Sequence, residues 1–254
     1  MGSTQGARMA KPKTPSAETL VTFLLDRSGS MAMIKDDTVG AFNTYLETLQ
    51  KEGAPITFSL LQFDSVSIDT LCKNQPVAAV AALTLEAFQP RGSTPLIDAC
   101  VKTIKAVEEA LAKRGAKRKV VICFQTDGQE NASTGHTWNE LNALIKAKSA
   151  EGWQFNFMGA GIDAYTTGAL MGVRAASTLS YDHRSEASTR AAFAATAVNT
   201  ASFASSRSNT TEYVGAQRDS VGDRFAGDRF SGKSEDEPKG PPVQSQSLID
   251  DISL

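Results

Sequence analysis

Two carboxylates and three hydroxyls in three short segments are the residues whose types and spacing suggest chemistry. Asp26, Ser28 and Ser30 occupy alternate positions in Asp-Arg-Ser-Gly-Ser, Thr94 lies in Arg-Gly-Ser-Thr-Pro, and Asp127 lies in Thr-Asp-Gly. No histidine or cysteine lies among them. Hard oxygen ligands of this kind suit a small hard cation that keeps some of its water. The set therefore predicts a divalent cation site, with Mg²⁺ as first choice and Mn²⁺ or Ca²⁺ as alternatives.

Such a site would be open to another protein. One or two carboxylates leave a divalent ion incompletely neutralised and its coordination shell incomplete. An Asp or Glu of a partner could supply the missing negative ligand. Each segment alone has a simpler explanation, because Ser30 could cap a helix and Asp127-Gly128 could form a turn. The three segments together, each at the end of a predicted strand or before a predicted helix, favour the metal site.

The elements that must position these residues alternate between apolar runs and segments of helical periodicity. Strands are predicted at 20–25, 56–63, 120–125, 153–158 and 175–180, with 66–71 as an antiparallel edge partner; helices are predicted at 34–52, 95–113, 138–150, 163–171 and 185–203. This alternation is typical of a parallel sheet buried on both faces. The sequence therefore predicts a doubly wound, Rossmann-like α/β fold with helices on both faces. Ligands of such folds bind beyond the carboxyl ends of the strands.

Over residues 18–203 the chain resembles the von Willebrand factor type A (VWA) domain family. The metal-ion-dependent adhesion site of that family has the pattern Asp-x-Ser-x-Ser, a distant Thr and a distant Asp, which Asp26, Ser28, Ser30, Thr94 and Asp127 match. The resemblance implies direct coordination by the two serines, coordination by Thr94 directly or through water, and water-mediated roles for the two aspartates. It also implies an intracellular bacterial or bacteriophage protein that works with ring-forming ATPases or in multi-protein assemblies.

Composition divides the chain into a flexible leader (1–17), a globular domain (18–203) and a disordered acidic tail (204–254). The tail holds six basic and nine acidic residues and only 13 apolar ones. So little apolar surface does not offset the entropy of ordering. Two copies of Gly-Asp-Arg-Phe (222–225 and 227–230) and the final Leu-Ile-Asp-Asp-Ile-Ser-Leu (248–254) resemble short binding motifs. Either could mediate self-association, and a merely solubilising tail is the alternative.

The charge balance and the cysteines narrow the partners and the compartment. A net charge of −2 provides no general field for nucleic acid or an anionic membrane. No stretch approaches the roughly 18 apolar residues of a membrane span. Cys72, Cys100 and Cys123 lie in apolar runs, are odd in number and favour a reducing compartment. We expect a cytoplasmic protein without nucleic-acid or membrane partners.

Three functions are compatible with these residues. The first is a binding module that captures an acidic side chain through its cation. The second is a magnesium-dependent phosphohydrolase, since Asp26 follows the first strand; the second Asp that such enzymes use two residues later is Ser28 here. The third is an assembly subunit joined through its tail. Because no nucleophile is paired with a general base, we expect the protein not to be an enzyme.

Weaker signals receive simpler interpretations. His136 and His183 are expected at the surface, and Asp64 at a hairpin turn. The Gly-Ala-Gly at 159–161 is expected to serve close packing rather than phosphate binding, because the third glycine of the phosphate motif is missing. Arg91 and residues 129–131 flank the predicted site, and we expect them to contact a partner.

Overall fold

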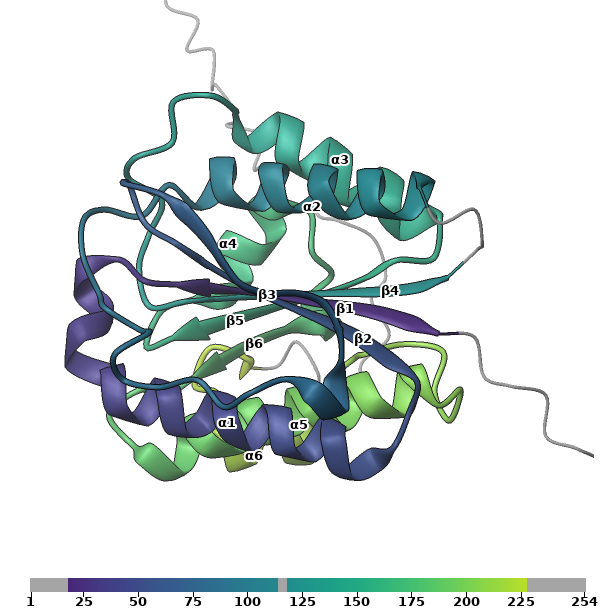
Figure 1. Cartoon of the computed structure of the whole chain (residues 1–254). Coiled ribbons are helices and arrows are strands. Elements are labelled where there is room, and N and C mark those ends of the chain that lie inside the picture. Colours follow the sequence, from purple (N-terminus) through teal and green to yellow (C-terminus); the bar gives the residue numbers. More distant parts are fainter. Residues whose placement is uncertain (1–17, 114–117, 228–254) are drawn as a thin grey trace, which may run out of the picture.

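The computed structural model describes residues 18–113 and 118–227. A six-stranded sheet with strand order β3-β2-β1-β4-β5-β6 forms the middle layer between two layers of helices (Figure 1). Its neighbouring strands are parallel except for β2 and β3, which are antiparallel. This confirms the predicted α/β fold. The strands are β1 (Thr19–Asp26), β2 (Ile56–Phe63), β3 (Ile68–Pro76), β4 (Lys119–Thr126), β5 (Gln154–Ala160) and β6 (Thr178–Tyr181).

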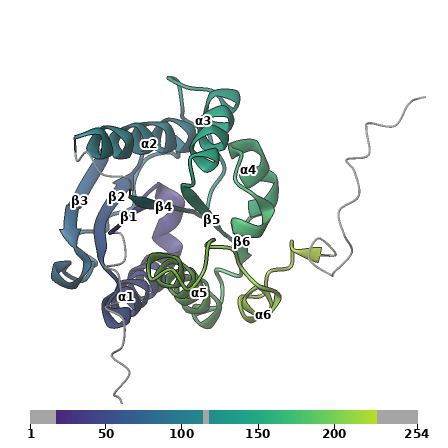
Figure 2. The same ribbon diagram turned by 90° about the vertical axis from the view of Figure 1, so that its right-hand side faces the viewer.

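The helices cover both faces of the sheet. One layer contains α2, α3 and α4, and the other contains α1 and α5 with the short α6 beside them (Figure 2). Their bounds are α1 (Lys35–Glu52), α2 (Leu96–Ala112), α3 (Trp138–Ala150), α4 (Ala164–Met171), α5 (Glu186–Ala204) and α6 (Gly215–Ser220). None of the described helices is both long and apolar enough to cross a membrane.

Burial explains why the sequence forms this sheet. Every residue of β1 is buried, as are nearly all residues of β4 and β5, because helices cover both of their faces. β3 is an edge strand, and its residues are exposed or half-buried. It is longer than the 66–71 expected from sequence. Ala175–Ser177, predicted as the start of the last strand, forms a short 3₁₀ turn.

Two hydrophobic cores lie on opposite faces of the sheet. The core beneath α1 and α5 is rich in aromatic residues: the Phe23 ring meets those of Phe42 and Tyr45 edge to face, with centroids 5.3 and 5.1 Å apart. The core beneath α2 and α3 also contains aromatic residues, and the rings of Phe124 and Phe155 stack with centroids 6.2 Å apart. Packing on both faces holds the strands in fixed register, so the loops at their carboxyl ends, to the left in Figure 1, start from rigid positions.

The chain remains folded beyond residue 203, contrary to the prediction of a disordered tail from 204. Ala204 is the last residue of α5, and α6 follows after a short connection. Tyr213 and Val221 are buried, and Arg218 is 2% exposed. Composition missed this segment because a buried arginine and its hydrogen bonds, rather than many apolar residues, hold it in place. The predicted leader (1–17) and the tail motifs beyond 227 lie outside the described residues.

Candidate metal site at the carboxyl edge of the sheet

The loops after β1 and β4 bring four of the five predicted ligands together. β1 and β4 are adjacent and parallel, so Asp26 and Asp127 leave the same edge of the sheet. The hydroxyl of Ser30 donates to Asp127 Oδ1 at 2.7 Å, and the Oγ atoms of Ser28 and Ser30 are 3.2 Å apart. Ser30 therefore does not cap a helix, which was its simpler interpretation.

Thr94 reaches the same point from the loop before α2. A Cβ atom added to Gly128 would lie 3.4 Å from Thr94 Oγ1 and 3.6 Å from Ser30 Oγ. The hydroxyls of Thr94 and Ser30 thus flank one small residue, and Gly128 leaves open the space between them. Thr94 itself is buried. The structure therefore gathers all five predicted residues in one place.

Asp26 is the most deeply placed member of the set. It is fully buried; its Oδ1 accepts a hydrogen bond from the Ser28 amide at 2.7 Å, and its Oδ2 accepts one from Thr126 Oγ1 at 2.5 Å. Burial raises the pKa of Asp26 to about 6, although these hydrogen bonds oppose the rise. Burial also raises the pKa of Asp127. Thr126, which sequence reasoning did not assign, holds the Asp26 carboxylate across 100 positions.

The donor set fits a hard divalent cation. It consists of carboxylate and hydroxyl oxygens, and within the described ranges neither aspartate forms an ion pair with Lys or Arg. A bound cation would offset the burial of these two carboxyl groups. Within the same ranges, no three His, Cys, Asp or Glu side chains are grouped as a metal site. The hydroxyls are therefore essential to any metal site here.

Ion pairs to the buried Asp64 fix the loops around the site from the side of β2 and β3. Arg27 Nε donates to Asp64 Oδ2 at 2.8 Å. Arg91 Nε donates to the same oxygen at 2.9 Å. Burial would raise the pKa of Asp64, but hydrogen bonds from backbone amides and both arginines outweigh it and lower that pKa. The Arg91 side chain is 48% exposed although it pairs with Asp64, so its predicted contact with a partner stays a prediction.

Asp64 also makes the hairpin turn predicted for it. Its Oδ1 accepts hydrogen bonds from the amides of Val66 at 2.7 Å and Ser67 at 3.0 Å. One oxygen therefore shapes the turn between β2 and β3 while the other holds two guanidinium groups. The sequence predicted the turn at Asp64, but only the tertiary structure shows that Asp64 also binds Arg27 and Arg91.

Glu130 and Asn131 join the Thr94 loop to the Asp127 loop. Thr94 N donates to Asn131 Oδ1 at 2.8 Å, and Asn131 N donates to Thr94 O at 3.1 Å. Glu130 Oε2 accepts from Ile97 N at 2.8 Å, at the start of α2. These hydrogen bonds fix the spacing between two segments of the site. Asn131 is exposed and Glu130 half-buried, and the predicted partner contact of residues 129–131 stays a prediction.

Asp98 continues this connection along the first turn of α2. Its Oδ2 accepts from the amides of Thr134 and Gly135, both at 3.1 Å, and its Oδ1 is 3.0 Å from His136 Nδ1. Burial would raise the pKa of Asp98, but these contacts outweigh it and hold that pKa below its ordinary value. His136, predicted as a surface residue, is half-buried and structural.

The close approach of the first two loops depends on glycine. Gly29 N donates to Gly92 O at 3.0 Å, joining the Ser28–Ser30 segment to the Thr94 loop. Gly92 has φ +67°, and a Cβ there would lie 2.5 Å from Ser65 Oγ. Gly159 also serves packing, as predicted, because a Cβ there would lie 2.7 Å from the Ala164 Cβ.

Comparisons with known proteins find solved structures with a similar fold but no matching sequence family. No protein-family model matches the chain, and no curated protein matches it in sequence. The pilus adhesin SpaC from Lactobacillus rhamnosus GG matches 74% of this chain and 31% of its own, with 15% identity and a TM-score of 0.58.

Two further solved structures match over a similar range. A von Willebrand factor type A protein from Catenulispora acidiphila matches 73% of this chain and 43% of its own, with 14% identity and a TM-score of 0.51. Proximal thread matrix protein 1 from the mussel byssus matches 70% of this chain and 47% of its own, with 14% identity and a TM-score of 0.51. This chain thus corresponds to less than half of each solved chain. At such identities the likeness concerns the fold, and the fold of this chain is that of a VWA-type α/β domain.

Proposed function

We propose that the protein is a metal-dependent protein interaction module that presents a divalent cation, Mg²⁺ in the first place, to an acidic side chain of a partner. The observation that carries this proposal is the gathering of Asp26, Ser28, Ser30, Thr94 and Asp127 at one edge of the sheet. The pattern that resembles an intact metal-ion-dependent adhesion site is spread over 102 positions of sequence yet occupies one place.

These five residues would hold the cation, which supplies a strong electrostatic attraction for one carboxylate. Ser30 is exposed and Asp127 half-exposed, whereas Asp26, Ser28 and Thr94 are buried. The site therefore has a solvent-facing side, where a partner's Asp or Glu can approach, and an inner side fixed by hydrogen bonds. The fixed loops around the cation would decide which carboxylate is accepted. The VWA-type fold, which also occurs in a pilus adhesin, agrees with an interaction role.

The environment of Asp26 favours this function over a phosphohydrolase. A nucleophilic aspartate needs an oxygen that can reach a phosphorus atom. Asp26 is fully buried, and both of its oxygens accept hydrogen bonds within the protein. Ser28 stands where a second catalytic Asp would be expected. Turnover of an aryl phosphate by the wild type, lost in Asp26→Asn, would instead support the enzyme.

We further propose a cytoplasmic setting within a multi-protein assembly, with a ring-forming ATPase as one candidate partner and self-association through the tail as another. Free cysteines in the described residues agree with a reducing compartment. A pull-down in Mg²⁺ and in EDTA, followed by identification of bound proteins, tests this. Retention of the same proteins in both buffers would contradict a metal-dependent partner.

Thermal unfolding with and without metal tests the site itself. At a free Mg²⁺ concentration 100 times Kd, binding stabilises the folded state by about 2.7 kcal/mol, which raises Tm by roughly 5–10 °C in a domain of this size. We expect this rise in the wild type and its loss in Asp127→Asn and Asp26→Ala. Asp219→Asn, an exposed acidic residue on α6, is the matched control and should respond like the wild type. Identical responses of all four proteins would contradict the proposal.

A further inference from the structure

A cavity of about 110 Å³ opens at the same edge of the sheet as the candidate metal site. It lies beyond the ends of β5 and β6, and its lining includes Gly161, His183, Arg184, Arg224 and Phe225. β5 is the next strand to β4, with Gly159 opposite Thr126, so the cavity neighbours the strand end that carries Asp127. The two features therefore face the same side of the molecule.

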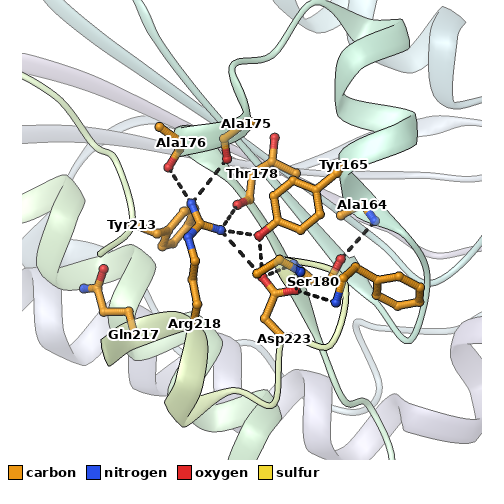
Figure 3. A network of polar contacts seen from close by, with 12 residues as sticks. Ala164, Tyr165, Ala175, Ala176, Thr178, Ser180, Tyr213, Gln217, Arg218 and Asp223 are labelled. Carbon is orange, nitrogen blue, oxygen red and sulfur yellow. Dashed lines mark hydrogen bonds and ion pairs between the residues drawn. The ribbon is translucent and has the colours of Figure 1, made fainter. Parts of the chain in front are cut away.

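The segment after α6 forms one wall of this cavity and is fixed by a buried polar network (Figure 3). Asp223 Oδ2 accepts from the Tyr165 hydroxyl at 2.5 Å and lies 3.5 Å from Arg218 Nη1. Arg218 also donates to the carbonyl oxygens of Thr178 at 2.6 Å and Ala176 at 3.0 Å. Both charged side chains are at most 2% exposed.

Backbone contacts complete the attachment of this wall. Asp182 N donates to Val221 O at 3.1 Å, which ties the segment to the end of β6. The positions of Arg224 and Phe225, one and two residues after Asp223, follow from this anchoring. The first Gly-Asp-Arg-Phe copy is thus a folded part of the domain surface, with its Asp inward and its Arg exposed.

The cavity carries more positive than negative side chains. Arg184 is exposed, and its Nε lies 3.2 Å from Asp182 Oδ1. Among the described residues that line the cavity, Asp182 carries the one carboxylate. Arg224 stacks on Phe225, with its Cζ 5.0 Å from the ring centroid, and forms no ion pair with any residue of 18–113 or 118–227. Its guanidinium donors are therefore available to an anionic ligand.

His183 adds an unsatisfied polar atom to this wall. Its Nδ1 is buried and has no hydrogen-bond partner among the described residues. It packs directly on Gly161, which has φ +70°, and a Cβ at that position would lie 1.9 Å from Nδ1. A side chain at Gly161 would displace the imidazole, so glycine is needed for the cavity to have this shape.

We propose that this cavity is a second acidic-group subsite, in which Arg224 and Arg184 bind a carboxylate of the same partner whose first carboxylate reaches the cation. This inference rests on the proposed function and deepens it, because it states that the partner carries two acidic groups. It also assigns a role in specificity to residues 222–225. Two carboxylates at a fixed separation are a narrower requirement than one.

The first experiment measures the cavity without the metal. Full-length protein in EDTA is titrated with N-acetyl-aspartate N-methylamide, and the backbone amide shifts of Gly161 and Gly222 are followed by NMR. We expect saturable shifts in the wild type. The affinity obtained from them should be at least fivefold weaker in Arg184→Gln/Arg224→Gln, and the asparagine analogue should cause no shifts. Arg190→Gln, which removes an exposed arginine of α5 outside the cavity, should match the wild type. No saturable shift, or equal shifts with both compounds, would overturn the subsite.

The second experiment tests the link between the two sites. Fluorescent capped peptides carry two aspartates separated by one to five Gly or Ser residues, and binding in Mg²⁺ is measured by anisotropy. At the best spacing we expect at least fivefold tighter binding than for the peptide with the second Asp changed to Asn, and loss of this advantage in the double-arginine variant. No advantage at any spacing would overturn the two-carboxylate proposal. Failure of the metal site itself would instead appear as equal binding in Mg²⁺ and EDTA, with the first experiment unaffected.

Discussion

The Ser30 hydroxyl donates a hydrogen bond of 2.7 Å to Asp127 Oδ1, joining two residues that are 97 positions apart. The bond spans the loops after two adjacent parallel strands, β1 and β4. It aligns one hydroxyl and one carboxylate oxygen, both partly open to solvent, before any ligand binds. A site arranged in advance loses less entropy when it takes up a cation.

Ser30→Ala should weaken Mg²⁺ binding far more than it weakens the fold. Ser30 is exposed, so the loss of its hydrogen bond should lower the free energy of unfolding by about 1 kcal/mol or less. Because Ser30 is proposed as a direct ligand, its loss should reduce Mg²⁺ affinity by at least tenfold, measured by isothermal titration calorimetry. Ser220→Ala, an exposed serine on α6, serves as the control. Equal affinities of the wild type and Ser30→Ala would exclude Ser30 as a ligand.

Glu130→Ala should loosen the connection between the Thr94 and Asp127 loops. Glu130 accepts hydrogen bonds from Ile97 N, Ala132 N and Ser133 N at 2.7–2.8 Å. Hydrogen bonds to a charged group contribute about 1.5–3 kcal/mol each, so we expect the free energy of unfolding in urea to fall by at least about 2 kcal/mol. Mg²⁺ affinity should fall as well, although Glu130 is not a ligand. Unchanged stability would show that the loops are held by other contacts.

The stability contributed by Asp98 should depend on pH. The folded-state pKa of Asp98 lies below its ordinary value of 3.8, so its contribution is fully present above that value and is lost as pH falls through the folded-state pKa. Asp98→Asn should therefore be less stable than the wild type by about 1.5–3 kcal/mol at pH 7. The difference should shrink below pH 4. Urea unfolding from pH 7 to pH 2.5 measures it, and a constant difference across that range would contradict this role.

Arg218→Met should detach the segment after α5. Removing this arginine leaves Asp223 buried without its opposite charge, and breaking a buried pair in this way costs about 3–5 kcal/mol. The urea midpoint should fall, and amide hydrogen exchange should accelerate between 213 and 226. Arg218→Met/Asp223→Asn should recover part of the loss, because no unpaired carboxylate remains. Unchanged exchange in Arg218→Met would show that apolar contacts of Tyr213 and Val221 suffice.

The fold could be predicted from the sequence because strands that are buried on both faces of the sheet consist of long apolar runs. Ile56–Phe63 and Trp138–Ala150 have the bounds that the pattern predicts. The edge of the sheet was less certain, since Ile68–Pro76 is exposed on one side and carries a weak pattern. The segment 205–227 was missed because one buried arginine replaces the apolar residues on which prediction relies.

The residues of the candidate site could be predicted from the sequence, but the residues that hold them in place could not. Asp26 and Asp127 are recognisable because each ends or follows an apolar strand. The holding of Asp26 by Thr126, and of Arg91 by Asp64, depends on which strands and loops are neighbours. For the same reason the hydrogen bond between Asn131 and the Thr94 amide was not predicted from the sequence.

By itself, the sequence determined the α/β alternation and the five oxygen-bearing residues, because apolar periodicity and residue type are local properties. Only the tertiary structure decided that these residues meet at one edge of the sheet, and that Arg224 and His183 line a cavity at the same edge. The physical reason is that such proximity follows from strand order and loop packing, which bring together Asp26 and Thr126 from positions 100 residues apart.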